Sequence, residues 1–145
     1  MTAKIALTDK PDASVVKALS LLLLDFNNNA SGYTYDGKPL AITKCDPDND
    51  AIIGGLWGAT GYGYLHLDLL FVPEEGRGRG MGGHLMELAE EEAIRRGCRG
   101  AWLDTFGFQA RGFYQRLGYT VVGELEDCPP GHKRYFMRKV FATKS

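Results

Sequence analysis

The sequence predicts a mixed α/β fold (α+β), with a mostly antiparallel sheet and flanking helices. The first observation is the order of the elements, which begins with a short strand and a helix and continues with several strands. The second is a hairpin pattern over residues 51–73. The third is a glycine-rich turn that joins a strand to a helix, after which a further strand follows. Such a crossover through a helix places two strands parallel within the sheet.

The first half of the chain supplies a strand, a helix and the hairpin. Residues 4–7 alternate apolar and polar side chains, so we expect a first strand. Apolar side chains over residues 10–32 recur at three- and four-residue spacing, which predicts a helix with Asp12 or Ser14 as its N-cap. Residues 33–45 are expected to form a loop and then a strand. Residues 51–73 are expected to form two strands around the turn GATGYG.

The second half predicts two helices between strands. A helix is expected from Gly80 to Gly97, and its inward face is predicted to hold Leu85, Leu88, Ala89 and Ala93 or Ile94. The i,i+4 spacing predicts ion pairs of Glu91 with Arg95 and Glu92 with Arg96. Residues 100–106 form a buried strand. The segment FQARGFYQRLG is a short helix with Ala110, Phe113, Tyr114 and Leu117 inward, and residues 119–126 and 134–142 are closing strands.

Length, charge and cysteine content exclude several classes of protein and of binding partner. A chain of 145 residues fits one domain, over residues 1–145. A net charge of -1 provides no positive field for nucleic acid or an anionic membrane, and no apolar run approaches a membrane span. The N-terminal sequence lacks a signal-peptide core. The three scattered cysteines indicate a reducing compartment and no structural metal. We therefore expect a cytoplasmic protein without metal, nucleic-acid or membrane partners.

The stretch FVPEEGRGRGMGGHL, residues 71–85, contains five glycines and two arginines just before a helix. Bare backbone amides and the positive end of the helix dipole make such a turn an anion site. Arg77 and Arg79 add forked donors that suit phosphate. The alternative is a set of turn glycines beside two solvated arginines. Five glycines before a helix favour a phosphate-bearing cofactor.

A dinucleotide fingerprint is also present in this turn. Gly78, Gly80 and Gly83 satisfy G-x-G-x-x-G, and Asp104 ends the next strand about twenty residues on. However, the residues PEEGR separate the preceding strand from the first of these glycines. Only 41 residues follow Asp104, too few for the further β–α units of a dinucleotide domain. A nicotinamide-binding oxidoreductase is therefore the weaker alternative.

Two segments resemble motifs of the GCN5-related N-acetyltransferase (GNAT) superfamily. VPEEGRGRGMGGHLMELAEEEA resembles motif A, whose signature of Arg or Gln, two residues, Gly, one residue and Gly or Ala is met by Arg77, Gly80 and Gly82. FQARGFYQRLGY resembles motif B, a short helix that carries a tyrosine before a Leu-Gly-aromatic ending. The resemblance covers about residues 50 to 141, and includes the first 49 only through the order of helix and strand.

This resemblance implies a GNAT-like fold and acetyl-CoA as the cofactor, with CoA as product and no metal. The pyrophosphate is then expected on the glycine turn, and the pantetheine beside a strand that splays away from its parallel neighbour. The two strands lie around residues 65–72 and 100–104. The implied cofactor-binding residues are Leu70, Phe71, Val72, Arg77, Gly78, Arg79, Gly80, Met81 and Gly82.

The resemblance makes Tyr114 the general acid. It matches the motif B tyrosine, and a phenol with a pKa near 10 stays protonated at neutral pH beside a leaving thiolate. The alternative is a core aromatic on a short amphipathic helix, as expected for Phe113. With the resemblance taken into account, the acid is the preferred interpretation.

His66 and Asp68 are candidates for the general base. They lie two residues apart on the strand YLHLDLLFV, so we expect them to share a face with each other and with Leu70. Asp68 matches a position where the family often has a carboxylate, whereas the reference pKa of His66 suits the reaction better. A water molecule is the third candidate. Both side chains are also compatible with solvated hairpin positions, and a His-x-Asp metal pair lacks a third ligand.

The resemblance implies an acetyl-CoA-dependent N-acetyltransferase that acts on a primary amine of a small molecule or peptide by direct transfer. Gly107 stands where motif B usually has an asparagine, and Gln109 or Thr105 are candidates to replace its contacts. This departure keeps a non-catalytic acyl-CoA sensor as an alternative. The loops over residues 27–38 and 124–135 are candidates to shape the acceptor pocket. The acceptor is not identified, and a homodimer is left open.

Overall fold

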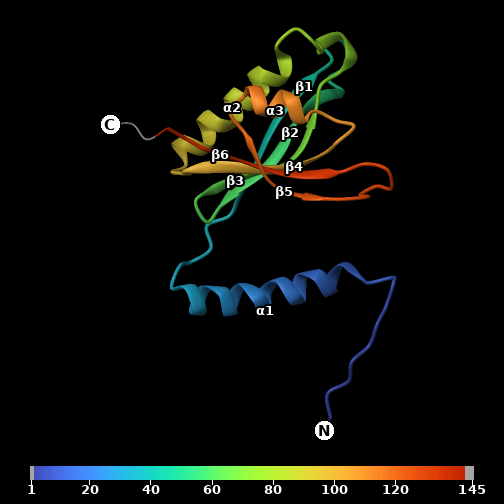
Figure 1. Cartoon of the computed structure of the whole chain (residues 1–145). Coiled ribbons are helices and arrows are strands. Elements are labelled where there is room, and N and C mark those ends of the chain that lie inside the picture. The colour runs from blue at the N-terminus through green and yellow to red at the C-terminus, as the bar shows by residue number, and fades with distance from the viewer. Residues whose placement is uncertain (1, 143–145) are drawn as a thin grey trace. The chain divides into compact units, whose positions relative to one another are not determined.

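A computed structural model describes residues 2–142 of the chain. The chain divides into two compact units, Met1–Tyr35 and Asp36–Ser145 (Figure 1). The first unit contains the helix α1 (Ala13–Ser31). The second unit contains β1 (Lys38–Cys45), β2 (Ile52–Gly61), β3 (Tyr64–Phe71), the short 3₁₀ turn η1 (Glu74–Gly76), α2 (Met81–Arg95), β4 (Gly100–Phe106), α3 (Arg111–Arg116), β5 (Thr120–Leu125) and β6 (Arg134–Val140).

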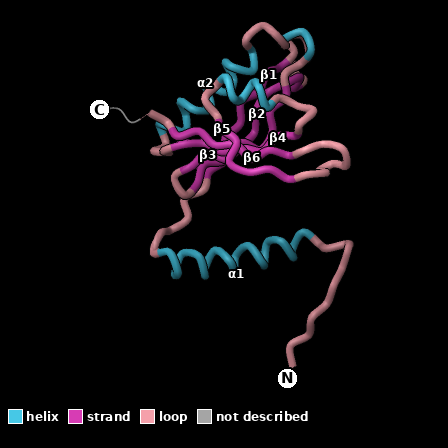
Figure 2. Tube along the Cα trace, in the orientation of Figure 1, coloured by secondary structure: helices cyan, strands magenta, loops and turns pink. Residues whose placement is uncertain are grey.

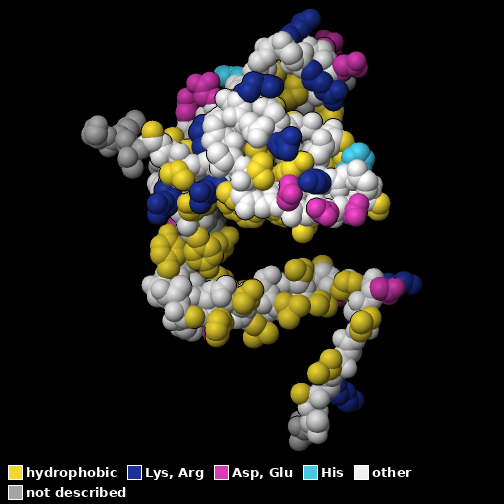
Figure 3. Space-filling view, in the orientation of Figure 1, with side chains coloured by type: hydrophobic (Ala, Val, Ile, Leu, Met, Phe, Trp, Pro, Cys, Tyr) yellow, Lys and Arg dark blue, Asp and Glu magenta, His cyan; other side chains and the backbone are white. Residues whose placement is uncertain are grey.

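The first unit is a single helix with loop on either side of it. α1 begins after its N-cap, Asp12, and ends before its C-cap, Gly32, which has a φ of 69°. Its apolar residues lie along the helix, as the space-filling view in Figure 3 shows. The predicted helix is therefore confirmed, with Asp12 rather than Ser14 as the cap. The strand predicted over residues 4–7 is wrong, because this segment has no partner strand with which to form a ladder.

The second unit is built on one six-stranded sheet with the order β1-β2-β3-β4-β6-β5 (Figure 2). Every neighbouring pair is antiparallel except β3 and β4, which are parallel. The crossover between those two strands contains α2, since a parallel connection has to return along the length of the sheet. The predicted mixed, mostly antiparallel sheet with one parallel pair is confirmed.

The hairpin between β2 and β3 has a tighter turn than predicted. Gly61 pairs with Tyr64, so only Tyr62 and Gly63 connect the strands. Both connecting residues have positive φ, at 52° and 82°, as two-residue turns between twisted strands require. The predicted turn GATGYG was too long, because its first four residues continue β2.

A bulge in β3 changes the pattern of side chains near the end of that strand. Leu67 pairs with Gly58 and Leu69 pairs with Trp57, so Asp68 has no partner on β2. The expectation that His66, Asp68 and Leu70 share one face is wrong, because an extra residue shifts the alternation. Leu70 packs against the core. His66 lies on the opposite face, between the buried Leu65 and Leu67.

The helices α2 and α3 lie on the same face of the sheet (Figure 1), and the core of the unit lies between them and the strands. α2 buries Leu85, Met86, Ala89 and Ala93. Leu88 is 38% exposed, so its predicted inward position is wrong, and of the alternatives Ala93 and Ile94 the buried residue is Ala93. α3 buries Tyr114, while the other three inward residues predicted for this segment are partly buried against the core.

The arginine that caps the C-terminal end of α2 attaches the helix to the edge of the sheet. Arg96 pairs with Glu92 at 2.7 Å, which confirms that predicted pair, and donates to the carbonyl of Pro39 and to Thr60 Oγ1. Arg95 also pairs with Glu92, so the predicted pair of Arg95 with Glu91 is wrong. The hydrogen bonds from Arg95 and Arg96 lower the pKa of Glu92 to about 2. The stabilisation from these pairs is therefore present above the ordinary pKa and lost as the pH falls towards 2.

The parallel strands β3 and β4 separate before they end. Their pairing runs from Tyr64↔Gly100 to Leu67↔Leu103 and stops there, so Asp68–Phe71 and Asp104–Phe106 have no partners across this gap. The expected splay is therefore present. It begins at the bulged Asp68, where the ladder to β2 also shifts. Within residues 2–142, no helix is long and apolar enough to cross a membrane.

The bulge requires glycine at position 58. A Cβ at Gly58 would lie 2.5 Å from the carbonyl oxygen of His66, whereas a Cβ at Gly123, on β5, meets nothing within 4 Å. We expect Gly58→Ala to lower the free energy of unfolding by about 1 to 3 kcal/mol, because backbone has to move to admit the methyl group. Gly123→Ala should leave it within about 0.5 kcal/mol. Urea unfolding of both variants measures the difference, and equal stabilities would contradict this account of the bulge.

Candidate active site

The glycine turn lies between η1 and the first residue of α2. Gly78 and Gly80 have φ of 75° and 80°, a backbone conformation that favours glycine. A Cβ at either position would meet nothing within 4 Å, so the turn leaves open space in front of its backbone. The first amides of α2 are directed towards the same end of the helix. The turn therefore has the free amides and the space that a bound phosphate needs.

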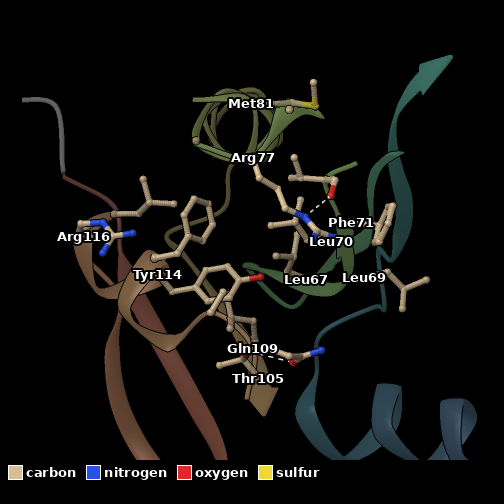
Figure 4. A pocket seen from close by; sticks show the side chains of 18 of the residues that line it. Leu67, Leu69, Leu70, Phe71, Arg77, Met81, Thr105, Gln109, Tyr114 and Arg116 are labelled. Atoms are coloured by element: carbon tan, nitrogen blue, oxygen red, sulfur yellow. Dashed lines mark hydrogen bonds between the residues drawn. The ribbon is translucent and has the colours of Figure 1, made fainter. Parts of the chain in front are cut away.

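A pocket of about 1090 Å³ connects this turn to the gap between β3 and β4. Figure 4 shows side chains from β3, the turn, α2 and α3 around it. Eight of the nine predicted cofactor residues line the pocket, namely Leu70, Phe71, Val72, Arg77, Gly78, Gly80, Met81 and Gly82. Arg79 does not. Of the three predicted catalytic residues, Tyr114 and Asp68 line the pocket and His66 does not.

Arg77, the first arginine of the turn, contacts residues at the end of β3. Arg77 Nε donates to the carbonyl oxygen of Val72 at 3.0 Å, and its guanidinium lies 5.7 Å from the centre of the Phe71 ring (Figure 4). These contacts hold the Arg77 side chain against the end of β3. Around the loop before α2, the visible surface carries Lys and Arg side chains together with acidic ones (Figure 3). The positive charge of the turn therefore has acidic side chains close to it and does not extend over a wide basic surface.

Tyr114 extends from α3 towards the pocket. Its hydroxyl is directed at the region of Leu67, near the point where β3 and β4 separate (Figure 4). The side chain is 7% exposed. Burial, and then the negative charge of Asp104, raise the pKa of Tyr114 to about 12. Both effects disfavour the phenolate, so the phenol keeps its proton well above neutral pH.

The missing motif B asparagine has a structural explanation. Gly107 donates its backbone N–H to the carbonyl oxygen of Lys133 at 2.7 Å. A Cβ at Gly107 would lie only 3.3 Å from that oxygen, so the β5–β6 hairpin leaves little room for a side chain. Gln109 organises this turn instead. Its Oε1 accepts hydrogen bonds from the N–H of Phe106 and from Thr105 Oγ1, which leaves its amide N–H groups available (Figure 4).

The two base candidates lie in different surroundings. Asp68 is exposed at the bulge and lines the pocket. His66 stacks on Trp102, with ring centres 3.9 Å apart and planes 19° apart. This stack holds the imidazole on the sheet face opposite α2 and α3. Within residues 2–142, no three potential ligands are grouped so that they could hold a metal ion.

Sequence reasoning missed Asp104 and Phe108 as pocket residues. In the sequence, Asp104 was recognised only as the acidic residue of a dinucleotide fingerprint. The signal that could have identified it is its place one residue after Leu103, at the carboxyl end of a strand parallel to β3. Such strand ends commonly carry functional side chains. Phe108 has no comparable signal, since its position depends on the turn that Gln109 organises.

Comparison with known proteins identifies the family. The sequence profile of the acetyltransferase (GNAT) family matches residues 9–119. Acetyltransferase Atu2258 of Agrobacterium fabrum (strain C58) is 40% identical over 135 residues, which cover 93% of this chain and 97% of that protein. Blasticidin-S acetyltransferase of Streptomyces morookaense is 37% identical over 107 residues, with 72% and 79% covered. A crystal structure of an Agrobacterium tumefaciens protein assigned as an acetyltransferase has a TM-score of 0.89 and 38% identity, covering 96% of this chain and 100% of that one.

These matches agree with the geometry of the second unit. The matched residues include both the glycine turn and Tyr114 on α3. The sheet has one parallel pair among antiparallel strands, which is not the doubly wound sheet of a dinucleotide-binding oxidoreductase. The chain belongs to the GNAT family and is an acetyltransferase.

Proposed function

We propose that the protein transfers the acetyl group of acetyl-CoA directly to a primary amine of a small molecule. The observation that carries the proposal is that one pocket joins the glycine turn, the gap between β3 and β4, and Tyr114. A donor with a phosphate at one end and a thioester at the other needs this combination. The name of the blasticidin-S acetyltransferase relative supports a small-molecule acceptor.

In this proposal the turn and the strand hold the donor. The amides of Arg77–Gly82 receive the pyrophosphate, and the unpaired edge of β3 over Leu70–Val72 hydrogen-bonds the pantetheine arm. The amide N–H groups of Gln109 are directed donors that can take the place of the absent asparagine. The charge of Arg79 acts on the pyrophosphate through solvent, since its side chain does not line the pocket.

The transfer requires the acceptor nitrogen to lose its positive charge first. An alkylammonium with a pKa near 10.4 is only about 0.1% neutral near pH 7.4. We assign the first proton to Asp68, directly or through water, because Asp68 lines the pocket and His66 does not. The neutral nitrogen then attacks the thioester carbon, and the carbon–sulfur bond breaks. Tyr114 donates its proton to the departing thiolate, and the second proton of the nitrogen returns through solvent to Tyr114.

The experiment that tests this function is an acceptor screen that follows free CoA thiol. Calorimetry with acetyl-CoA first establishes donor binding, and a panel of primary amines then reports turnover. Acetyl-CoA binding without turnover on any amine would overturn the proposed reaction. The cytoplasmic location, a homodimeric state and a single acetyltransferase domain over residues 1–145 stay predictions.

The glycine turn can be tested with a charge-matched pair of variants. Gly80→Asp places a carboxylate in the open space before α2, so we expect acetyl-CoA affinity to fall at least tenfold, about 1.4 kcal/mol. Gly97→Asp is the control, because Gly97 has a similar φ of 87° and a Cβ there also meets nothing within 4 Å, but it follows the opposite end of α2. Calorimetry should show affinity near that of wild type for Gly97→Asp. Equal losses in the two variants would place the anion elsewhere.

Tyr114 can be tested against a second buried tyrosine. Tyr114→Phe removes the phenolic proton and keeps the ring, so we expect kcat to fall by about 10²-fold while acetyl-CoA affinity is retained. Tyr119→Phe is the control, because Tyr119 bonds Glu90 and does not line the pocket. With the pKa of Tyr114 near 12, its loss of a proton should not reduce the wild-type rate below about pH 10. An unchanged kcat in Tyr114→Phe would remove it as the acid.

The base can be identified from the pH dependence of kcat/KM. We expect Asp68→Asn to flatten the acidic limb of the profile and to leave acetyl-CoA affinity unchanged. His66→Gln should keep the wild-type profile, since the stack on Trp102 holds His66 outside the pocket. If His66→Gln flattens the limb instead, the assignment to Asp68 is wrong. If neither variant changes the profile, water bound to strand carbonyls is the base.

A further inference from the structure

The point where β3 and β4 separate also places a carboxylate in the pocket. The last paired residues are Leu67 and Leu103, and the next residue on β4 is Asp104. Asp104 lines the same pocket as Tyr114 and the glycine turn. After burial, the negative charge of Asp104 is the second cause that raises the pKa of Tyr114. Asp104 is therefore a pocket carboxylate at the point where the two strands separate.

Only one oxygen of this carboxylate is engaged. Arg134 Nε and Nη2 lie 2.7 and 2.6 Å from Oδ2 of Asp104. Oδ1 accepts no hydrogen bond from the part of the chain that the structure describes. The side chain is 23% exposed, so it is partly shielded from water and still accessible. A partly shielded carboxylate with a free oxygen is suited to receive a cationic donor.

An aromatic surface, made of Phe106, Phe108 and His132, follows directly after Asp104. The rings of Phe106 and Phe108 are nearly parallel, with planes 2° apart and centres 5.3 Å apart. His132, on the β5–β6 hairpin, meets Phe108 edge-on at 4.9 Å. The guanidinium of Arg134 lies over Phe106 at 5.2 Å, and so links this surface to Asp104.

Phe108 lines the pocket and is also exposed to solvent. Its side chain is 57% exposed although it is large and apolar. The turn that holds it is fixed from both sides, by the hydrogen bonds to Gln109 and by that of Gly107 to the hairpin. Phe108 is therefore a fixed apolar surface at the mouth of the pocket. Flat groups pack well on such a ring.

We propose that the acceptor binds at the end of β4, with its ammonium group at Oδ1 of Asp104 and a flat, apolar part of the molecule on the aromatic surface. This inference rests on the proposed function and adds the class of acceptor. Asp104 binds and orients the ammonium, while Asp68 takes its proton. The acceptor is thus a small amine with an aromatic or otherwise planar body.

The test compares two amines that differ only in the ring. 2-Phenylethylamine and 2-cyclohexylethylamine have the same chain between ring and nitrogen, so only the flat ring distinguishes them. We expect the wild-type enzyme to acetylate the phenyl compound with a kcat/KM about three- to tenfold higher. Phe108→Leu should remove this preference. Trp102→Leu is the control, because Trp102 lies two residues before Asp104 on β4 and does not line the pocket, and it should keep the preference.

The carboxylate is tested separately with variants of the ion pair. Asp104→Asn should raise the KM of both amines about tenfold or more, with acetyl-CoA affinity unchanged. Arg134→Gln breaks the same ion pair but keeps the carboxylate, so it should raise the amine KM less than Asp104→Asn does. If the pair were only structural, both variants would act alike. Glu124→Gln is the control, since Glu124 forms a comparable surface pair with Lys133 and should behave as wild type.

The outcomes separate this inference from the function on which it rests. Acetylation of both amines without a ring preference, or with equal effects of Asp104→Asn and Arg134→Gln, overturns the acceptor site and leaves the acetyltransferase function standing. Acetyl-CoA binding with no turnover on any amine of the panel overturns both. A ring preference that Phe108→Leu removes, together with an amine KM that Asp104→Asn raises more than Arg134→Gln does, supports the site.

Discussion

The candidate active site depends on the separation of two parallel strands. β3 and β4 pair over only four residues each, after which their backbone groups no longer satisfy one another. Unpaired backbone is costly unless other groups or a ligand satisfy it. The bulge at Asp68 adjoins the parting, and Gly58 is what allows β2 to approach β3 so closely there. The pocket is therefore a consequence of the sheet's own register, and the helices only complete its walls.

The charge that the protein presents changes from one end of this pocket to the other. At one end, the glycine turn offers backbone amides and the helix dipole, which favour an anion. At the parting of the strands, the buried Tyr114 keeps its proton because burial and Asp104 both disfavour the phenolate. Near the hairpin, Asp104 offers an oxygen that can receive a cation. A single pocket thus presents a positive end, a neutral proton donor and a negative end in the order that an acetyl transfer to an amine needs.

Local patterns in the sequence predicted most elements of this structure. α2 was predicted from its spacing of apolar residues, and α3 from its amphipathic segment and the glycine after it. The β2–β3 hairpin was recognisable from alternation, although its turn proved shorter. The strand predicted over residues 4–7 failed because four alternating residues say nothing about a partner strand. The face of α2 was predicted only in part, since Met86 is fully buried and Leu88 is not.

Residues that are neighbours in the chain were enough to predict the family and the glycine turn. The glycine spacing and the tyrosine of the short helix needed no tertiary information. Tertiary structure decided which side chains meet in the pocket. It separated His66 from Asp68 through one extra residue in β3, and it brought Asp104 into the same pocket as Tyr114 from another element. The physical reason is that a bulge or a strand parting is set by pairing between distant segments, which no local pattern encodes.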